Sequence, residues 1–242
     1  MRTVVVIPTY EEALNIEGIL IRTRDALPQA DILVVDDNSP DRTADLSEKV
    51  GAEIGGVHLL RRAGRGGLGR AYRAGWGWAL ERDYEIVVSM DADGSHDPIE
   101  LSVMTGLIED GADLVMGSRY VPGGSVPNWA WHRRLLSAWG NRYAGLMLGL
   151  PVRDATGGFR AYRADLLRRI DMSTVRANGY GFQIELVHRA VELGATVREV
   201  PITFEDRRLG TSKMSSKIIW EALGLVTWWG ISDRVRHLRG RR

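Results

Sequence analysis

Short apolar runs that alternate with helical stretches constrain the fold of this chain most strongly. The runs are rich in valine and isoleucine, and each is too short for a helix, so each predicts a buried strand. Five such strands are expected, at residues 3–7, 32–35, 57–60, 86–90 and 114–117. Segments with helical spacing separate the strands, which predicts an α/β fold with a mostly parallel central sheet and helices on both faces.

The regular alternation fades after residue 120. A loop rich in glycine and proline is expected at residues 121–127. The later segments predict helices at residues 132–148, 165–169 and 182–193, and strands at residues 159–163 and 197–204. No internal repeat and no clear linker divides the chain. We therefore expect one large domain over residues 1–217 and a C-terminal appendage over residues 218–242.

The composition excludes several classes of function. Hydrophobic residues make up 44% of the chain, which is enough for a sizeable core. The formal net charge of +1 argues against a general nucleic-acid-binding protein. The chain has no cysteine, so disulfides, thiolate metal sites and cysteine nucleophiles are excluded.

The C-terminal appendage has the composition of a membrane-surface segment. Residues 218–231 are apolar and contain three of the eight tryptophans, and residues 232–242 hold five arginines and one aspartate. The alternative is a C-terminal helix that packs on the core and ends in a solvated basic tail. No apolar stretch reaches the roughly 18–20 residues that span a bilayer, and no signal peptide is recognised. We expect a cytoplasmic protein, peripheral on the cytoplasmic face of the membrane.

Asp91-Ala92-Asp93 follows the predicted strand 86–90 directly. Ligands of open α/β sheets bind at the carboxyl ends of the strands, and carboxylates suit hard divalent cations. The pair therefore suggests metal-assisted handling of a phosphorylated substrate, although two aspartates at this spacing are a weak signal alone.

Acidic residues also follow the first two strands. Glu12 belongs to the segment 8–12, where it could bond a base or a ribose; the alternative is an ordinary strand-to-helix turn. Asp36-Asp37 could accept hydrogen bonds from ribose hydroxyls or a base. The alternative for that pair is helix capping, which Asp41 could provide instead.

The segment from Gly64 to Gly69 matches the pattern G-x-G-x-x-G of dinucleotide-binding folds. Two strand–helix units precede it, whereas the fingerprint usually sits on the first. A single ribose-binding carboxylate would also leave Asp93 and the Asp36-Asp37 pair unexplained. An NAD-dependent oxidoreductase is therefore kept only as a rival class.

Five donor side chains lie outside the regular part of the predicted sheet. Together they could bind two phosphate groups, since the arginine fork suits phosphate oxygens. They are Arg119, Arg133, Ser137, Arg207 and Lys213. The five histidines show no ligand spacing, and only His96 lies beside the acidic motif.

Five segments, in this order, carry a resemblance to a known family. They are VIPTYEE, VVDDNSPD, MDADGSHDP, GSRY and EDRRLGTSK. The chain resembles the GT-A-fold glycosyltransferases of family 2, and among them the dolichol-phosphate mannosyltransferases, called polyprenol-monophosphomannose synthases in bacteria. The resemblance covers about residues 3–229 and implies transfer of mannose from GDP-mannose to a polyprenyl phosphate.

The resemblance also implies roles for single residues. The guanosine part of the donor would be bound by Pro8, Tyr10, Glu12, Val35 and Asp37. The sugar diphosphate and the metal would be met by Asp91, Ala92 and Asp93, with Arg207 and Lys213 on the diphosphate. The acceptor phosphate would be held by Arg119, Arg133 and Ser137. We expect Asp91, Asp93 and Arg119 to be catalytic, and Asp93 to hold Mg²⁺ or Mn²⁺, with Asp91 as a second candidate ligand.

Two features depart from the family pattern. Ser95 stands where some members have glutamine, which puts a protein ligand of the metal in doubt, and water could fill that position. Some members carry C-terminal transmembrane helices that this chain lacks, so the resemblance implies a membrane-anchoring partner protein. A glucosyl or aminoarabinosyl transferase to the same lipid is the nearest alternative, and a non-catalytic nucleotide-sugar-binding module is a further rival.

Overall fold

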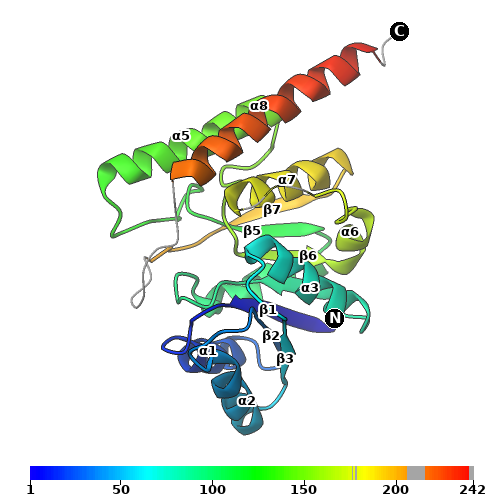
Figure 1. Ribbon diagram of the computed structural model, residues 1–242. Helices are drawn as coiled ribbons and strands as arrows, with labels where there is room; N and C mark the ends of the chain where they lie inside the picture. The colour runs from blue at the N-terminus through cyan, green and yellow to red at the C-terminus, as the bar shows by residue number, and fades with distance from the viewer. Residues whose placement is uncertain (176, 178, 206–215, 240–242) are drawn as a thin grey trace.

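The computed structural model describes residues 1–175, 177, 179–205 and 216–239. Within them, seven strands form one sheet in the order β3-β2-β1-β4-β6-β5-β7 (Figure 1). The strands are β1 (Thr3–Thr9), β2 (Asp31–Asp36), β3 (Val57–Arg61), β4 (Ile86–Ser89), β5 (Leu114–Ser118), β6 (Arg160–Arg163) and β7 (Val197–Pro201). Only β6 runs antiparallel to its neighbours among these pairs, so the prediction of a mostly parallel sheet is confirmed.

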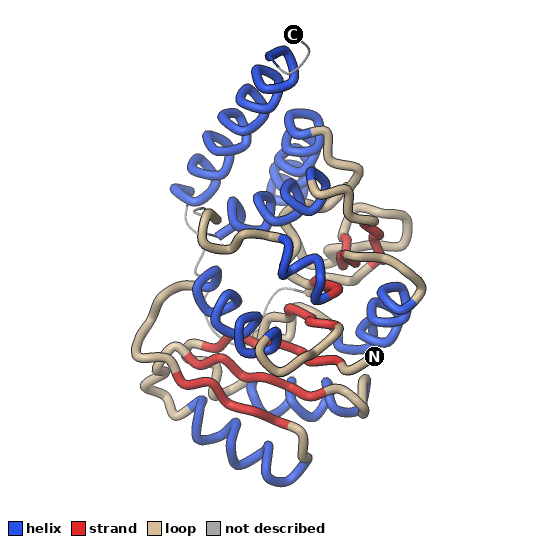
Figure 2. Tube along the Cα trace, turned by 90° about the vertical axis from the view of Figure 1, so that its right-hand side faces the viewer, coloured by secondary structure: helices blue, strands red, loops and turns tan. Residues whose placement is uncertain are grey.

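The helices cover both faces of the sheet, as predicted (Figures 1 and 2). They are α1 (Ile16–Ala26), α2 (Thr43–Ile54), α3 (Leu68–Leu80), α4 (Leu101–Glu109), α5 (Trp131–Leu148), α6 (Ala164–Arg169), α7 (Gly179–Glu192) and α8 (Ser216–Arg239), with a 3₁₀ turn at Pro98–Glu100. The five predicted strands of the first half lie within one or two residues of the observed ends. The strand expected at residues 197–204 ends earlier, at Pro201, and Thr203 forms only an isolated bridge with Ser125.

The core divides into two clusters, one on each face of the sheet. Val4 and Val6 of β1 pack with α3, α6 and α7, whereas Val5 and Ile7 pack with α1, α2 and α4. All four side chains are fully buried. The continuous apolar run of β1 is therefore explained by burial on both faces, because neighbouring side chains of a strand point to opposite sides.

Helices α5 and α8 lie side by side at the end of the molecule beyond α7 (Figure 1). Val226 of α8 is buried in the core cluster, and the Tyr143 and Thr227 hydroxyls are hydrogen bonded across the two helices at 2.7 Å. The described part of the C-terminal segment is therefore a helix packed on α5 and α7. No helix in the described part of the chain is both long and apolar enough to cross a bilayer. The boundary between residues 217 and 218 stays a prediction.

Candidate active site

The register of the sheet brings three of the predicted segments to one edge. Thr9 pairs with Asp36, and Val6 pairs with Ser89, so β1, β2 and β4 end next to one another. Tyr10 follows β1, Asp37 follows β2, and Asp91 comes shortly after β4. The carboxyl ends of parallel strands thus place the predicted donor-binding residues together, where open α/β sheets bind ligands.

Asp91 and Asp93 are both partly buried and held in place by hydroxyl groups. Tyr72 of α3 donates to Asp91 Oδ1 at 3.0 Å, and burial together with this carboxylate raises the pKa of Tyr72 well above its usual value. Asp93 Oδ1 accepts bonds from the Ser95 amide at 3.1 Å and the Ser95 hydroxyl at 2.6 Å. Ser95 therefore orients the second aspartate, and it does so from the position where the family resemblance raised a doubt.

The loop after β1 is fixed by local hydrogen bonds. Glu12 is buried and accepts a bond from the Asn15 side chain at 2.8 Å, and its amide donates to Thr43. Arg65 of the glycine-rich turn lies over the Tyr10 ring, with 4.5 Å between the guanidinium carbon and the ring centroid. The loop that follows β1 and the glycine-rich turn are therefore in contact.

The two aspartates after β2 have separate partners. Asp36 is buried and accepts bonds from Thr9 at 2.9 Å and from the Ser39 hydroxyl at 2.6 Å, so it ties β1 to the loop. Asp37 is also buried and accepts bonds from Arg62 and from the Gly66 amide. The alternative for this pair was capping of the following helix, but at the start of α2 the Thr43 amide donates to Asp41 instead, at 3.1 Å.

Arg119 and Arg133 approach the same indole ring. The Arg133 guanidinium carbon lies 3.9 Å from the Trp129 ring centroid, and that of Arg119 lies 5.5 Å from it. Arg119 follows β5, whereas Arg133 and Ser137 lie one turn apart on α5. The structure therefore brings the three residues predicted for the acceptor phosphate to one region.

A cavity of about 100 Å³ opens beside these residues. Its polar lining comes from Arg133, Ser137 and Thr156. The rest is mainly apolar. Trp129 comes from the segment before α5, and α5, α7 and α8 contribute Leu136, Gly140, Tyr143, Ile184, Ala222, Leu223 and Val226. The cavity thus combines one cationic and two hydroxyl side chains with a mainly apolar lining.

Several residues of this region were missed by sequence reasoning. Asp154 accepts three hydrogen bonds from Arg119, and Thr156 accepts a fourth. Asn141 of α5 bonds Thr156, and Tyr72 bonds Asp91. Each is a single polar residue in a loop or helix, so only the fold reveals its partner.

Two of the predicted donor-binding residues, Arg207 and Lys213, lie outside the described residues. His96 is buried and stacks on Phe159, with 5.0 Å between centroids, and its Nδ1 accepts the Asp91 amide, so it has a structural role. In the described part of the chain, a metal-compatible group of three side chains also occurs away from the aspartate motif, between α7 and α8, at His188, Glu192 and Asp233.

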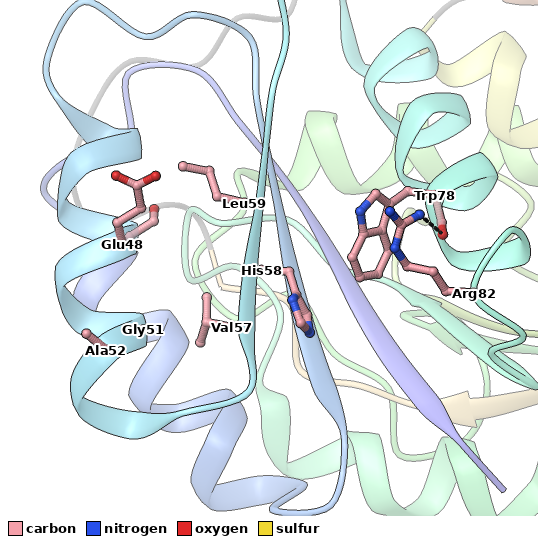
Figure 3. Close-up of a pocket in the computed structure, with 9 residues that line it drawn as sticks. Glu48, Gly51, Ala52, Val57, His58, Leu59, Trp78 and Arg82 are labelled. Atoms are coloured by element: carbon pink, nitrogen blue, oxygen red, sulfur yellow. Dashed lines mark hydrogen bonds between the residues drawn. The ribbon is translucent and has the colours of Figure 1, made fainter.

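A larger hollow of about 630 Å³ lies at the β3 edge of the sheet (Figure 3). It follows the outer edge of β3 and is flanked by Glu48 of α2 on one side and by Trp78 and Arg82 of α3 on the other. None of the predicted site residues lines it. The polar groups around Asp91 and Arg119 are therefore the better candidate for the active site.

Comparison with known proteins agrees with this geometry. Residues 4–171 match the model of glycosyl transferase family 2. The chain is 50% identical over 240 residues to the polyprenol monophosphomannose synthase of Mycolicibacterium smegmatis, covering 99% of this chain and 91% of that protein. It is 49% identical over 241 residues to the undecaprenyl-phosphate mannosyltransferase of Micrococcus luteus, covering 100% of this chain and 99% of that protein.

A solved structure shares the fold. The mannosyltransferase from Pyrobaculum calidifontis, determined in complex with GDP-Man and Mn²⁺, superposes with a TM-score of 0.61 over 99% of this chain and 74% of its own length, at 16% sequence identity. The fold expected from the motifs is thereby confirmed. The rival class of NAD-dependent oxidoreductases is not supported, and this chain belongs to glycosyl transferase family 2.

Proposed function

We propose that this protein transfers mannose from GDP-mannose to a polyprenyl phosphate and releases GDP. The observation that carries the proposal is the cavity between α5, α7 and α8. It combines the cationic and hydroxyl groups of Arg133 and Ser137 with an apolar lining. A phosphate head on an isoprenoid tail has the same division between a charged end and an apolar body. The names of the two relatives at 49% and 50% identity support the same acceptor class.

The arrangement of the sheet supports a position for the donor. Tyr10, Glu12 and Asp37 gather at the ends of β1 and β2, and Asp91 and Asp93 at the end of β4. The nucleoside would lie over the first group and the diphosphate over the second. Transfer would then occur between the β4 end and Arg119.

The acceptor chemistry explains why a general base is not needed. A phosphate monoester has a second pKa near 6, so it is largely a dianion at neutral pH. Its oxygen can attack the anomeric carbon without first losing a proton to the protein. Arg119 and Arg133 would offset the repulsion between the acceptor and the donor diphosphate. A single direct displacement inverts the anomeric centre, from the α donor to a β product.

The residues at the β4 end fit a divalent cation. Asp91 and Asp93 offer hard carboxylate oxygens, the ligand type that Mg²⁺ and Mn²⁺ prefer, and Ser95 holds Asp93 in a fixed orientation. A bound cation would supply charge stabilisation for the departing diphosphate.

The outer surface of α5 and α8 supports a peripheral position at a membrane surface; the cytoplasmic face stays a prediction. Trp131 and Trp139 of α5 are 76% and 51% exposed, and Trp228 of α8 is 68% exposed. Helix α5 also carries three arginines and no acidic residue. Exposed tryptophan beside arginine is typical of surfaces that bind anionic lipid interfaces. The membrane-anchoring partner protein stays a prediction of the family resemblance.

A screen of sugar nucleotides tests the function. The purified protein is incubated with polyprenyl phosphate, Mg²⁺ or Mn²⁺, and GDP-mannose, UDP-glucose or a UDP-linked aminosugar. We expect lipid-extractable sugar with GDP-mannose and little with the others. Preferential transfer from UDP-glucose would show that the protein is a glucosyltransferase and that the proposed donor sugar is wrong. Donor binding without any transfer would instead favour a non-catalytic nucleotide-sugar-binding module.

A further inference from the structure

Arg119 is held by a carboxylate that no sequence motif singled out. Its side chain is 5% exposed, and the side chain of Asp154 is fully buried. Asp154 Oδ2 accepts the Arg119 amide at 3.0 Å and Nε at 2.7 Å, and Oδ1 accepts Nη2 at 2.6 Å. This two-pronged contact fixes the plane of the guanidinium group, because both prongs would have to break for it to rotate.

Thr156 contacts Arg119 as well and links it to Asn141. Its hydroxyl accepts a bond from Arg119 Nη2 at 2.7 Å and lies 3.2 Å from Asp154 Oδ1, to which it donates. The Asn141 side-chain amide donates to the same hydroxyl at 3.2 Å, and the Thr156 amide donates to Asn141 Oδ1 at 3.2 Å. One proton donated and two bonds accepted use the full capacity of the threonine hydroxyl.

Asn141 connects this network to the helix that carries the other acceptor residues. It lies on α5 one turn after Ser137, and its side-chain amide also donates to the Ser137 carbonyl at 3.1 Å. Arg133 lies one turn before Ser137. The loop that holds Asp154 is in turn fixed to β7, since Glu199 accepts the amides of Arg153 and Asp154 at 2.8 Å and 3.0 Å. The network therefore joins the sheet to α5 at the polar end of the cavity.

The surroundings of Asp154 leave it unsuited to accept a proton. Burial alone would raise the pKa of Asp154, but the Arg119 charge and the bonds from Arg119 and Thr156 outweigh it and hold the pKa below its usual value. A carboxylate that stays ionised and accepts bonds at both oxygens is a weak base.

We propose that Asp154, Thr156 and Asn141 are positioning residues that act through Arg119 and fix it for the acceptor phosphate. The inference rests on the proposed function, since it assumes that Arg119 meets the phosphate of the lipid. Asp154 orients the Arg119 guanidinium, and Thr156 accepts a further bond from it. Asn141 holds Thr156 and thereby keeps Arg119 at a fixed position relative to Arg133 and Ser137 on α5.

A double-mutant cycle tests the inference. Asp154→Asn, Arg119→Ala and the double variant are compared by the KM for polyprenyl phosphate and for GDP-mannose. We expect each single variant to raise the acceptor KM about tenfold or more, by analogy with groups that orient the ligands of a metal ion, with the donor KM nearly unchanged. The double variant should be little worse than Arg119→Ala, because residues that act through one another do not add.

Two further variants separate positioning from folding. Removing one partner of a buried ion pair can unfold a protein, so Thr156→Val, which keeps both charges, is measured as well. It should raise the acceptor KM severalfold with an unchanged melting temperature. Glu185→Gln is the matched control: Glu185 is a buried carboxylate, but its bonds come from Arg189 and the Ala177 amide. It should leave both KM values unchanged.

Farnesyl phosphate binding, measured by calorimetry, separates the two possible failures. A wild-type protein that neither binds farnesyl phosphate nor transfers mannose contradicts the proposed function and the inference with it. An active wild type whose Asp154→Asn and Arg119→Ala effects add, or whose Asp154→Asn variant loses donor affinity equally, overturns the inference alone. The pH profile of kcat gives one more check. If Asp154→Asn loses activity at high pH while its acceptor KM stays normal, Asp154 acts as a general base, and the positioning role is overturned.

Discussion

At the scale of single residues, the site is a set of charges held by specific partners. Asp37 illustrates this, because the carboxylate that was predicted to meet the donor nucleoside also accepts bonds from Arg62 and the Gly66 amide. Its position and that of the glycine-rich turn are therefore linked. The G-x-G-x-x-G pattern, whose dinucleotide-binding interpretation was kept only as a rival, serves here as the turn whose Gly66 amide bonds Asp37.

The turn gives a test of that link. A Cβ on Gly66 would lie 2.6 Å from Arg62 Nη2, so Gly66→Ala must push the Arg62 guanidinium away from its place beside Asp37. We expect the affinity for GDP, measured by calorimetry, to fall about tenfold, which corresponds to roughly 1.4 kcal/mol. Gly64→Ala is the control, because nothing lies within 4 Å of its Cβ. Equal affinities in both variants would show that the Arg62–Asp37 contact does not shape the donor site.

Asp93 gives a second test at this scale. Asp93→Ala should lower the rate of mannosyl transfer about a thousandfold or more, because a metal ion stabilises the departing diphosphate by several kcal/mol in the transition state. The melting temperature should stay close to that of the wild type, since Asp93 is only partly buried. Asp110→Ala, on the exposed end of α4, serves as the control. Transfer at a near-normal rate would remove Asp93 from the metal site.

At the scale of elements, α5 serves two surfaces. Its inner side contributes Arg133 and Ser137 to the cavity, and its outer side exposes Trp131, Leu135 and Trp139. One helix thus offers anion-binding groups and an apolar surface that could meet a lipid.

Adjacent arginines on α5 test the inner side. Arg133 lines the cavity, whereas Arg134 is exposed and is not part of its lining. Arg133→Ala should raise the KM for polyprenyl phosphate about 10- to 100-fold, as expected for a lost charge-assisted hydrogen bond, and leave the KM for GDP-mannose unchanged. Arg134→Ala should change neither value more than about twofold. If both variants behave alike, or if Arg133→Ala weakens the donor equally, the acceptor role of Arg133 is wrong.

The outer side is tested by vesicle sedimentation. The triple variant Trp131→Ser, Trp139→Ser and Trp228→Ser should lose most of its binding to vesicles that contain anionic lipid, because each indole contributes apolar area at the interface. The matching control changes Leu14, Ile99 and Val103 to serine, which are 77%, 68% and 52% exposed on other elements. Unchanged vesicle binding of the tryptophan variant would leave α8 as an ordinary packed helix with a basic tail.

Some elements were predictable from sequence and others were not. The strands β1, β2 and β4 could be located because they are buried on both faces and so consist of continuous apolar residues. The place of β6 could not: it enters between β4 and β5 with an arginine at each end, and Arg160 is fully buried. Arg160 donates to the carbonyl groups of Ala155, Gly157 and Gln183, partners that only the fold supplies.

The same limit applies to the site. The aspartates at the strand ends were found because their position follows from the strands themselves. Asp154, which binds Arg119, was not found, because an aspartate in a loop has no local signature and its partner lies 35 residues away.

At the scale of the whole molecule, the proposed function would have the two substrates approach from different sides. The residues predicted to bind the donor lie at the ends of β1, β2 and β4. The cavity of Arg133 and Ser137 is lined by α5, α7 and α8, of which α5 and α8 lie side by side at one end of the molecule (Figure 1). Arg119, which follows β5, donates a hydrogen bond to Thr156, one of the residues that line this cavity. Under the proposed function, a lipid would remain at the membrane while its phosphate reaches a donor bound from the aqueous side.

The identity and anomeric configuration of the product test this arrangement most directly. The purified protein is given GDP-mannose and polyprenyl phosphate with Mg²⁺ or Mn²⁺, and the lipid extract is examined by ³¹P and ¹H nuclear magnetic resonance. We predict a polyprenyl phosphodiester that carries mannose in the β configuration, formed only when both substrates are present. A product in the α configuration would contradict the direct displacement, and the absence of any mannose on the lipid phosphate would contradict the proposed function itself.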